Sequence, residues 1–439
     1  MTSEELLTQS GNAAWMLMSA SLVLLMTPAL ALFYGGMSRQ KSVLNMMMMS
    51  FGTIGVVSII YVLWGWSISY GSHDVAGIIA NPFEFFGLKD SITDADGNYI
   101  AGANGYPNII DVGFQLTFAV ISTALISGAL AERVKFSTWM VFSGCWATLV
   151  YAPLAHMVWG GGLLSGAESG LAAKIFGVGE DGKALIEPID FAGGTVVHIS
   201  AGTAALVLAL IVGARKNFKT APQRPHNLPL VMTGAAFLWF GWFGFNAGSA
   251  FAADGAAGLA WLNTTIATAA AMLGWVIVEK LRDGHATSLG AASGIVAGLV
   301  TITPAAGAAT PLTSIILGFI GGVIAAFAVG LKYRFGFDDS LDVVGVHLCA
   351  ALWGTIGIGL FADGRGLLTG GGSDGFKLFI VQIIIAVVAV IFAGIVTAII
   401  AFVLKAIMGW RVSEDIEVTG IDTKVHGESA YDTIGPDIR

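Results

Sequence analysis

The sequence predicts an all-α integral membrane protein with eleven transmembrane helices, and three observations support this fold class. Charged residues make up 11% of the 439 residues, against roughly 25% in an ordinary soluble chain. Hydrophobic residues make up 55% and occur in long continuous runs. Positive charge gathers in every second connection between those runs. So little charge cannot cover the surface of a soluble protein of this size, which excludes a cytosolic enzyme, a nucleic-acid-binding protein and a disordered chain.

Each apolar run is long enough to cross the membrane as a helix, because about 20 apolar residues span the hydrocarbon core. A transmembrane β-barrel would instead show alternating segments of about ten residues. Pro304 and the Gly- and Ala-rich stretch after it separate the eighth run from the ninth. The eleven predicted spans lie near 12–34, 43–70, 110–132, 138–159, 190–213, 227–251, 258–279, 287–303, 310–333, 342–362 and 376–408.

The distribution of Lys and Arg predicts the orientation of these spans. If the N-terminus lies outside, 16 of the 21 Lys and Arg residues fall in the inner connections and the tail. Cytoplasmic connections of membrane proteins carry such an excess of positive charge. An odd number of spans then leaves the C-terminus inside. We therefore expect a short extracellular N-terminus (1–11), a transmembrane domain (12–408) and a cytoplasmic C-terminal tail (409–439).

The first apolar run is expected to be a retained span rather than a signal peptide. It follows the acidic Glu4 and Glu5 instead of positive residues, and it is longer than the apolar core of a signal peptide. Cys145 and Cys349 lie in apolar stretches without metal-ligand spacing, so neither a disulfide framework nor a zinc site is expected. No nucleophile with a neighbouring base is apparent, and we expect neither an enzyme nor a bound cofactor.

Two of the seven histidines lie well inside predicted spans, where ionisable groups usually mark a functional pathway. His198 ends the segment DFAGGTVVH (190–198), and His347 ends DVVGVH (342–347). The fifth span starts outside and the tenth starts inside, so the two segments run in opposite directions. This pattern indicates an inverted repeat, in which spans one to five match spans six to ten and span eleven is added. We therefore expect the two imidazoles to meet near the membrane midplane.

Each of these residues also has a purely structural interpretation. Either histidine could hydrogen-bond a neighbouring helix, and Asp190 and Asp342 could each cap the helix that follows. In an apolar lumen, burial favours the uncharged imidazole, which has one donor and one acceptor nitrogen. Because no acidic ring or carbonyl filter is visible, a facing pair suits a small polar molecule or a weak acid–base couple better than sodium or potassium.

Eight segments are distributed along nearly the whole chain. They are LFYGGMSRQKSVLN (32–45), FQLTFA (114–119), GALAERVKF (128–136), AHMVWGGG (155–162), DFAGGTVVHIS (190–200), PHNLP (225–229), GWFGFNAGSA (241–250) and VHLCAALWG (346–354). In this order they closely resemble the ammonium transporter family, which comprises the Amt proteins, the methylammonium permeases and the Rh proteins. The paired histidines and the FGFNAGSA stretch resemble bacterial Amt members more than Rh proteins.

The resemblance implies roles for individual residues near the outer surface. The family's recruitment site for the cation matches Phe118, Trp159 and Ser249. Aromatic faces attract a desolvated cation by up to about 2 kcal/mol, and a serine oxygen accepts an N–H hydrogen bond. Asp190 matches an acidic residue near the vestibule that is structural, or that favours the cation without touching it.

Deeper in the protein, the resemblance implies a closed and largely apolar pore. The stacked phenyl rings that occlude the pore in the family match Phe118 and Phe245. The twin histidines that line it match His198 and His347. Each aromatic side chain could instead serve helix packing alone, and Trp242 is expected to belong to that class.

The implied function is transport of ammonium and methylammonium across the cell membrane. The cation loses a proton at the outer site and ammonia crosses the pore; transport is electrogenic if the proton follows along the imidazoles. The family forms homotrimers with one pore per subunit. The tail segment GIDTKVHGESAY (420–431) resembles the family's cytoplasmic tail, under which a PII-type signalling protein often binds. The alternatives are an ammonium sensor and a passive Rh-like channel for dissolved gases.

Overall fold

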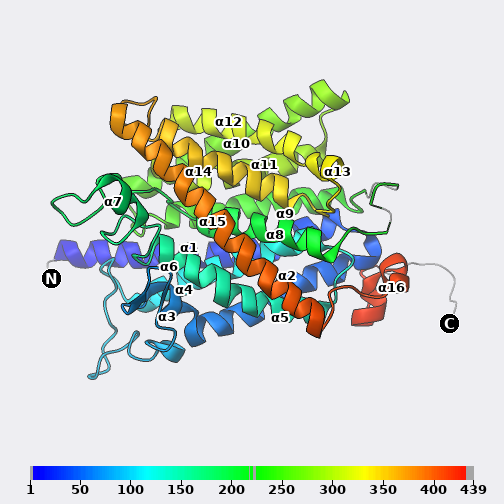
Figure 1. Cartoon of the computed structure of the whole chain (residues 1–439), viewed down its shortest axis with the longest axis horizontal. Helices are drawn as coiled ribbons and strands as arrows, with labels where there is room; N and C mark the ends of the chain where they lie inside the picture. The colour runs from blue at the N-terminus through cyan, green and yellow to red at the C-terminus, as the bar shows by residue number, and fades with distance from the viewer. Residues whose placement is uncertain (1–2, 217, 221–223, 432–439) are drawn as a thin grey trace.

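The computed structural model describes residues 3–216, 218–220 and 224–431, and it shows a bundle of long helices (Figure 1). Within these residues, eleven helical segments are long and apolar enough to cross a membrane. This agrees with the eleven predicted spans. The break at Pro304 is also confirmed, because the eighth and ninth segments cover Ser288–Ala305 and Pro311–Phe335.

The spans are built from straight helices and short π-helical or 3₁₀ turns, which are labelled η. Spans one to five comprise α1 (Ser3–Met37); α2 (Val43–Ile60), η2 (Tyr61–Gly65) and α3 (Trp66–Tyr70); α4 (Asn108–Ile126) and η4 (Ser127–Leu130); α5 (Phe136–Trp146), η5 (Ala147–Tyr151) and α6 (Ala152–Val158); and η6 (Gly194–Ile199) with α8 (Ser200–Val212). The first helix thus begins before residue 12, where the first apolar run was expected to start.

The second half has the same mixture of elements. Spans six to eleven comprise α9 (Leu228–Trp242) and η7 (Phe243–Ala247); α10 (Gly255–Asp283); α11 (Ser288–Ile302) and η8 (Thr303–Ala305); α12 (Pro311–Ala328) and α13 (Leu331–Phe335); η9 (Val344–Cys349) and α14 (Ala350–Phe361); and α15 (Gly372–Ile407). The remaining elements are η1 (Gln40–Ser42), β1 (Asp74–Val75), β2 (Ile79–Ala80), η3 (Phe86–Leu88), α7 (Leu171–Phe176), α16 (Glu414–Thr419) and η10 (Asp422–His426).

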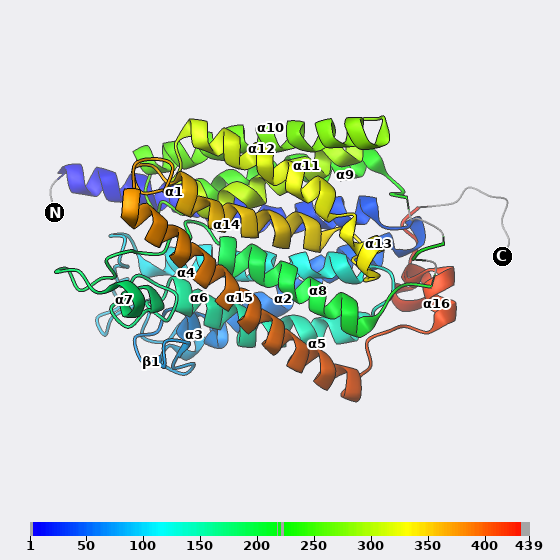
Figure 2. The same cartoon turned by 45° about the horizontal axis from the view of Figure 1, so that its top comes forward.

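The bundle has two opposite faces. The N-terminal face carries the start of α1, the connection 71–107 with its small hairpin of β1 and β2, and the connection 159–193 with α7. The C-terminal face carries α16 and η10 (Figures 1 and 2). The long α15 crosses the bundle obliquely from one face to the other (Figure 1).

Glycines allow the helices to approach closely, both within the second half of the bundle and between the two halves. A Cβ atom on Gly298 of α11 would lie 2.6 Å from the Cβ of Ala271 on α10. A Cβ atom on Gly244 of η7 would lie 2.6 Å from the Cβ of Leu22 on α1. Small residues are the usual means of close helix contact in lipid, where no hydrophobic force draws helices together.

A buried ion-pair network joins the connection after α4 to the loop before η9 at the C-terminal face. The fully buried guanidinium of Arg133 donates to the carbonyls of Ala129 (2.9 Å) and Asp338 (2.7 Å). Arg215 donates two hydrogen bonds to the Asp338 carboxylate, at 2.8 and 2.9 Å. Burial lowers the pKa of Arg133 to about 10. Although burial opposes it, hydrogen bonding from Arg215 lowers the pKa of Asp338, so the carboxylate stays ionised.

The described part of the tail packs against the ends of the spans. Arg39, which follows α1, donates to the backbone oxygen of Glu417 in α16 at 2.7 Å. The Asp422 carboxylate accepts the backbone N–H groups of Leu44 (3.0 Å) and Asn45 (2.8 Å). These N–H groups belong to the first turn of α2 and have no partner within their own helix. A tail residue therefore caps a membrane helix.

We predict that Asp338→Asn destabilises the protein by about 3 to 5 kcal/mol, because it removes the counter-ion of the fully buried Arg133 and weakens the hydrogen bonds that Arg215 donates to this side chain. The measurement is the thermal unfolding midpoint of the purified protein in detergent, followed by tryptophan fluorescence. The control is Asp363→Asn, since Asp363 is exposed on the opposite face. Equal midpoints for the two variants would contradict a stabilising role of the network.

Candidate functional site

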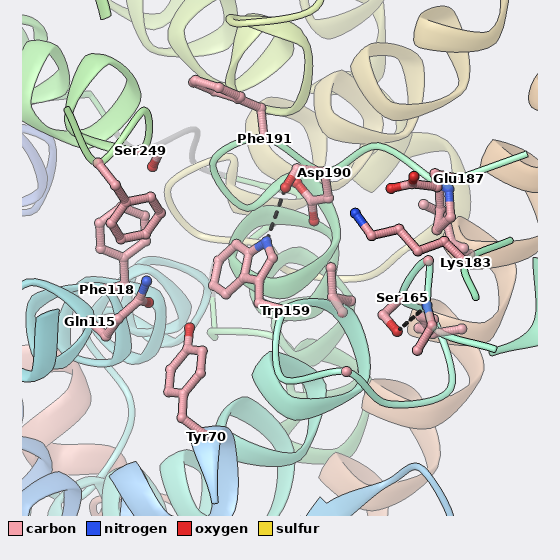
Figure 3. Close-up of a pocket in the computed structure, with 18 residues that line it drawn as sticks. Tyr70, Gln115, Phe118, Trp159, Ser165, Lys183, Glu187, Asp190, Phe191 and Ser249 are labelled. Carbon is pink, nitrogen blue, oxygen red and sulfur yellow. Dashed lines mark hydrogen bonds between the residues drawn. The ribbon is translucent and has the colours of Figure 1, made fainter. Parts of the chain in front are cut away.

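A cavity of about 530 Å³ opens on the N-terminal face and is lined by side chains from several spans (Figure 3). The lining residues with aromatic or polar side chains are Tyr70, Gln115, Phe118, Trp159, Ser165, Lys183, Glu187, Asp190, Phe191, Ser249 and Phe251. Three residues that the sequence predicted as a recruitment site, Phe118, Trp159 and Ser249, are thus brought together here from three different spans.

The Trp159 ring is fixed at the wall of this cavity. Its indole N–H donates to the backbone oxygen of Asp190 at 3.0 Å (Figure 3). The ring stands edge-on to Phe118, with centroids 6.2 Å apart and planes at 83°. Ser249 donates its hydroxyl hydrogen to the backbone oxygen of Phe245 at 2.8 Å, so its oxygen lone pairs remain able to accept. Two aromatic rings and an acceptor oxygen are the groups that a small cation with N–H bonds requires.

Two stacked phenyl rings close the cavity at its base. The rings of Phe118 on α4 and Phe245 on η7 are parallel to within 19°, with centroids 4.1 Å apart. Both side chains are buried. Any molecule that passes from the cavity toward the centre of the bundle must therefore displace at least one of these rings.

The two histidines inside the spans meet directly behind this gate. His198 lies 5.9 Å from Phe245, centroid to centroid, and its Nδ1 lies 3.3 Å from the Nδ1 of His347. Both side chains are buried. Since the two Nδ1 atoms share one hydrogen bond, one ring donates and the other accepts, which requires opposite tautomers of two neutral imidazoles. The Nε2 atom of His198 is buried without a protein partner, so it can bond a guest molecule.

Each of the three central side chains sits on a π-helical turn. His198 lies in η6, Phe245 in η7 and His347 in η9. A π turn adds one residue to a helical turn and re-aims the side chains that follow, and such turns concentrate at functional sites. The hydropathy pattern of the spans contains no signal for these turns, so only the structure reveals them.

Carboxylates cap the N-terminal ends of the two spans that carry the histidines; Asp339 is buried and Asp190 is partly exposed. Asp190 accepts the backbone N–H groups of Gly193 (2.9 Å), Gly194 (2.6 Å) and Thr195 (2.9 Å), and also the Thr195 hydroxyl. The interpretation of Asp190 as a helix cap is therefore confirmed. The Asp190 carboxylate lies beside the cavity, but its oxygens accept hydrogen bonds from the start of its own helix. It therefore contributes negative charge to the cavity without binding a ligand directly.

The expectation that Asp342 is the counterpart of Asp190 is wrong, because Asp339 caps the other span. The Asp339 carboxylate accepts the N–H groups of Val343 (3.0 Å) and Val344 (2.7 Å). Asp190 and Asp339 each stand eight residues before a histidine. Asp342 has a left-handed backbone, at a φ of 65°, and its carboxylate instead lies 2.6 Å from the ammonium group of Lys332. The sequence pattern predicted the wrong cap because Asp342 is the acidic residue at the start of DVVGVH (342–347), whereas the actual cap lies three residues earlier.

Sequence analysis missed three side chains of the site. The buried Tyr70 hydroxyl and Gln115 Oε1 have no hydrogen-bond partner in the described structure, and both residues line the cavity (Figure 3). Trp242 stacks on His198, with centroids 5.4 Å apart and planes at 14°, so it contacts the histidine pair directly. Gln115 could have been found from the sequence, because it is a polar residue one helical turn before Phe118 in an apolar span.

A second cavity, of about 880 Å³, opens on the C-terminal face. Its wall includes the ion pair of Lys332 and Asp342, which precedes His347 in the chain. Arg39, Glu132 and Arg215 also line it. Throughout the described residues, no group of three or more His, Cys, Asp or Glu is placed to hold a metal ion. The arrangement is therefore two water-accessible cavities on opposite faces, with the phenyl gate and the imidazole pair between them.

Comparison with known proteins shows the family to which the sequence is similar. A family model described as "Ammonium Transporter Family" matches residues 14–431. The chain is 49% identical to an "Ammonium transporter" of Mycobacterium tuberculosis, over 96% of this chain and 90% of that protein. It is 46% identical to an "Ammonium transporter" of Aquifex aeolicus, over 96% of this chain and 93% of that protein.

Solved structures share the fold. The "Sensor Amt Protein" superposes with a TM-score of 0.84 at 26% identity, covering 96% of this chain and 99% of that one. The structure of Saccharomyces cerevisiae Mep2 superposes with a TM-score of 0.79 at 31% identity, covering 93% of this chain and 89% of that one.

We predict that stability falls as pH rises between about 4 and 7, partly because of Asp339. Burial raises the pKa of Asp339 to about 6, with Asp342 adding to this and Lys332 opposing it. The folded protein therefore holds this proton more tightly than the unfolded chain does, and the resulting stabilisation of up to about 3 kcal/mol is lost as pH passes through 6. Asp339→Asn should flatten the pH dependence of the unfolding midpoint. Asp254→Asn, which alters an exposed helix cap, should leave the slope unchanged; equal slopes in all three proteins would exclude this role for Asp339.

Proposed function

The chain belongs to the ammonium transporter family, and from this premise we propose how its side chains carry the substrate. Ammonium or methylammonium binds in the cavity of the N-terminal face, against Phe118, Trp159 and Ser249. The cation gives up a proton there, and the neutral amine passes the phenyl gate and the imidazole pair. The observation that supports this path best is an unbroken series of ring contacts through the protein.

That series leads from the cavity to the centre of the bundle. Trp159 contacts Phe118, Phe118 stacks on Phe245, Phe245 contacts His198, and His198 hydrogen-bonds His347. Each contact joins side chains from different spans. An apolar gate followed by neutral nitrogen donors and acceptors suits a small uncharged amine, which needs few but specific hydrogen bonds.

The apolar gate also explains why the proton must leave before passage. Moving an intact cation past two phenyl rings into a region of low dielectric costs several kcal/mol in lost hydration. Ammonia carries no such cost. Potassium has a similar size and charge but has no proton to release, so the same gate excludes it. Measuring charge movement on addition of ammonium to proteoliposomes decides whether the proton follows the amine across.

The proposed topology places the N-terminal face outside the cell membrane and the C-terminal face in the cytoplasm. The excess of Lys and Arg in the connections of the C-terminal face supports this orientation. An inverted repeat of five spans, followed by the final α15, is supported by the matched spacing of Asp190 to His198 and of Asp339 to His347. By the same reasoning, residues 1–11 are extracellular, 12–408 form the transmembrane domain and 409–439 form the cytoplasmic tail.

The proposed assembly is a homotrimer with one pore per subunit, as in the family that the sequence resembles. Apolar side chains exposed along α10 and α12, such as Leu273 and Leu312, support burial of these surfaces against lipid or neighbouring subunits. The cavity of the C-terminal face and the packed tail beside it form the surface proposed for a PII-type signalling protein.

An ammonium sensor is the second candidate function, because the structural neighbour with a TM-score of 0.84 is named "Sensor Amt Protein". Flux of methylammonium into proteoliposomes separates a transporter from a protein that binds and only signals. A passive Rh-like gas channel is the third candidate. Trp159 and Ser249, which can hold a cation, favour a transporter over such a channel.

We predict that His198→Ala or His347→Ala abolishes selective methylammonium uptake, because the remaining imidazole loses its hydrogen-bond partner and the path loses one polar site. Uptake into proteoliposomes is the measurement, with assembly checked by size-exclusion chromatography. His285→Ala is the matched control, since His285 is exposed in a connection. Normal uptake that is insensitive to potassium in both variants would remove the histidine pair from the mechanism.

We predict that Trp159→Leu raises the KM for methylammonium by about 3- to 30-fold, the range expected for loss of a partly desolvated cation–π contact. Vmax should change much less, because the gate and the imidazoles remain. Trp261→Leu serves as the control, since Trp261 lies on the surface of α10. An unchanged KM in Trp159→Leu would exclude a recruiting role for this ring.

A further inference from the structure

His156 lies in the last turn of α6, three residues before Trp159. Only 1% of its surface is exposed, so it is buried directly below the cavity wall. None of the steps described above uses this side chain. Its environment nevertheless differs from that of an ordinary packed histidine, because both of its ring nitrogens have close polar partners.

Both partners of the His156 ring are acceptors. Nδ1 lies 3.2 Å from the backbone oxygen of Ser69 in α3. Nε2 lies 2.9 Å from a carboxylate oxygen of Asp74 in β1. A neutral imidazole carries one N–H and could satisfy only one of these oxygens, whereas an imidazolium donates to both. The hydrogen bond to His156 is the main reason that the pKa of Asp74 is lowered, so this carboxylate is ionised.

The backbone of His156 closes the turn that follows Trp159. Its carbonyl oxygen accepts the N–H groups of Gly160 (3.0 Å) and Gly162 (3.1 Å). A Cβ atom on Gly160 would lie 2.7 Å from Nδ1 of His156 and would also collide with the Ser69 carbonyl. The imidazole, α3 and the turn are therefore in tight contact, and the backbone of Trp159 lies within this turn.

Other titratable groups near α6 do not compete for the imidazole. Tyr70 on α3, Tyr151 on η5 and His198 on η6 belong to elements that pack against α6, yet none of them hydrogen-bonds His156 in the described structure. Glu84 lies beyond the hairpin and pairs with His73. The charge that faces His156 is that of Asp74.

We propose that His156, protonated on both ring nitrogens, forms an ion pair with Asp74 that positions Trp159 for cation binding. His156 is a positioning residue, since it touches neither the gate nor the proposed substrate. The pair ties the hairpin of β1 and β2 to the end of the fourth span, and so it holds the cavity wall in place. This inference rests on the proposed recruiting role of Trp159.

The first experiment measures methylammonium uptake by Asp74→Asn in proteoliposomes at pH 7. Asp74 is about half exposed, so this variant is expected to fold. KM should rise about 3- to 5-fold with Vmax within twofold. Asp74→Glu, which keeps the charge, should retain more of the wild-type affinity.

Asp96→Asn is the matched control, since it removes an exposed carboxylate from the same connection without a contact to His156. A KM in Asp74→Asn equal to that of Asp96→Asn would overturn the proposal. If Trp159→Leu raises KM but Asp74→Asn does not, this inference fails and the proposed function stands. If Trp159→Leu itself leaves KM unchanged, the proposed recruiting role fails instead.

The second experiment tests the protonation state without transport. Histidine labelled with ¹⁵N is introduced into the reconstituted protein, and solid-state NMR is recorded at pH 7. An imidazolium signal that disappears in His156→Gln supports the ion pair. If the signal lost in His156→Gln is that of a neutral ring, the proposal is overturned.

Discussion

The hydrocarbon of a membrane offers backbone groups no hydrogen-bond partner, and the rest of the structure depends on this constraint. Every backbone N–H group needs a partner within the protein, so the free N–H groups at the start of a span require a side chain that accepts them. Asp190 and Asp339 do this for the spans that carry His198 and His347. The carboxylates stabilise the N-terminal ends of these two spans, and the spans bring the Nδ1 atoms of the two imidazoles to within 3.3 Å.

The same constraint accounts for the sequence of groups along the proposed path. Charged side chains lie at the two cavities, with Asp190 in the wall of the first and the ion pair of Lys332 and Asp342 in the wall of the second. Between them lie the phenyl gate and the neutral histidines, which together present almost no charge. The proposed ion pair of Asp74 and His156 agrees with this separation of charged and neutral groups, because it lies beside the cavity and outside the proposed path.

Much of the fold could be predicted because hydropathy and the positions of Lys and Arg are one-dimensional signals. The spans, the break at Pro304 and the cap at Asp190 each depend on residues that are close together in the sequence. The π turns and the positions of Tyr70 and Gln115 in the cavity wall depend on how distant spans pack, so no local pattern contains them. Asp342 shows the limit most clearly: it has the right residue type near the right histidine, but its backbone and Lys332 commit it elsewhere.

The three π turns make the centre of the protein unusually sensitive to chain length. Each turn contains one residue more than a regular helical turn. Deleting a single residue from Gly194–Ile199 would let that segment relax into an α-helix and swing everything on one side of it by about 100°. The imidazole of His198 would then leave its neighbour, although every span kept its hydropathy. A deletion of one residue can therefore abolish the function of a span whose length and hydropathy are still those of a membrane helix.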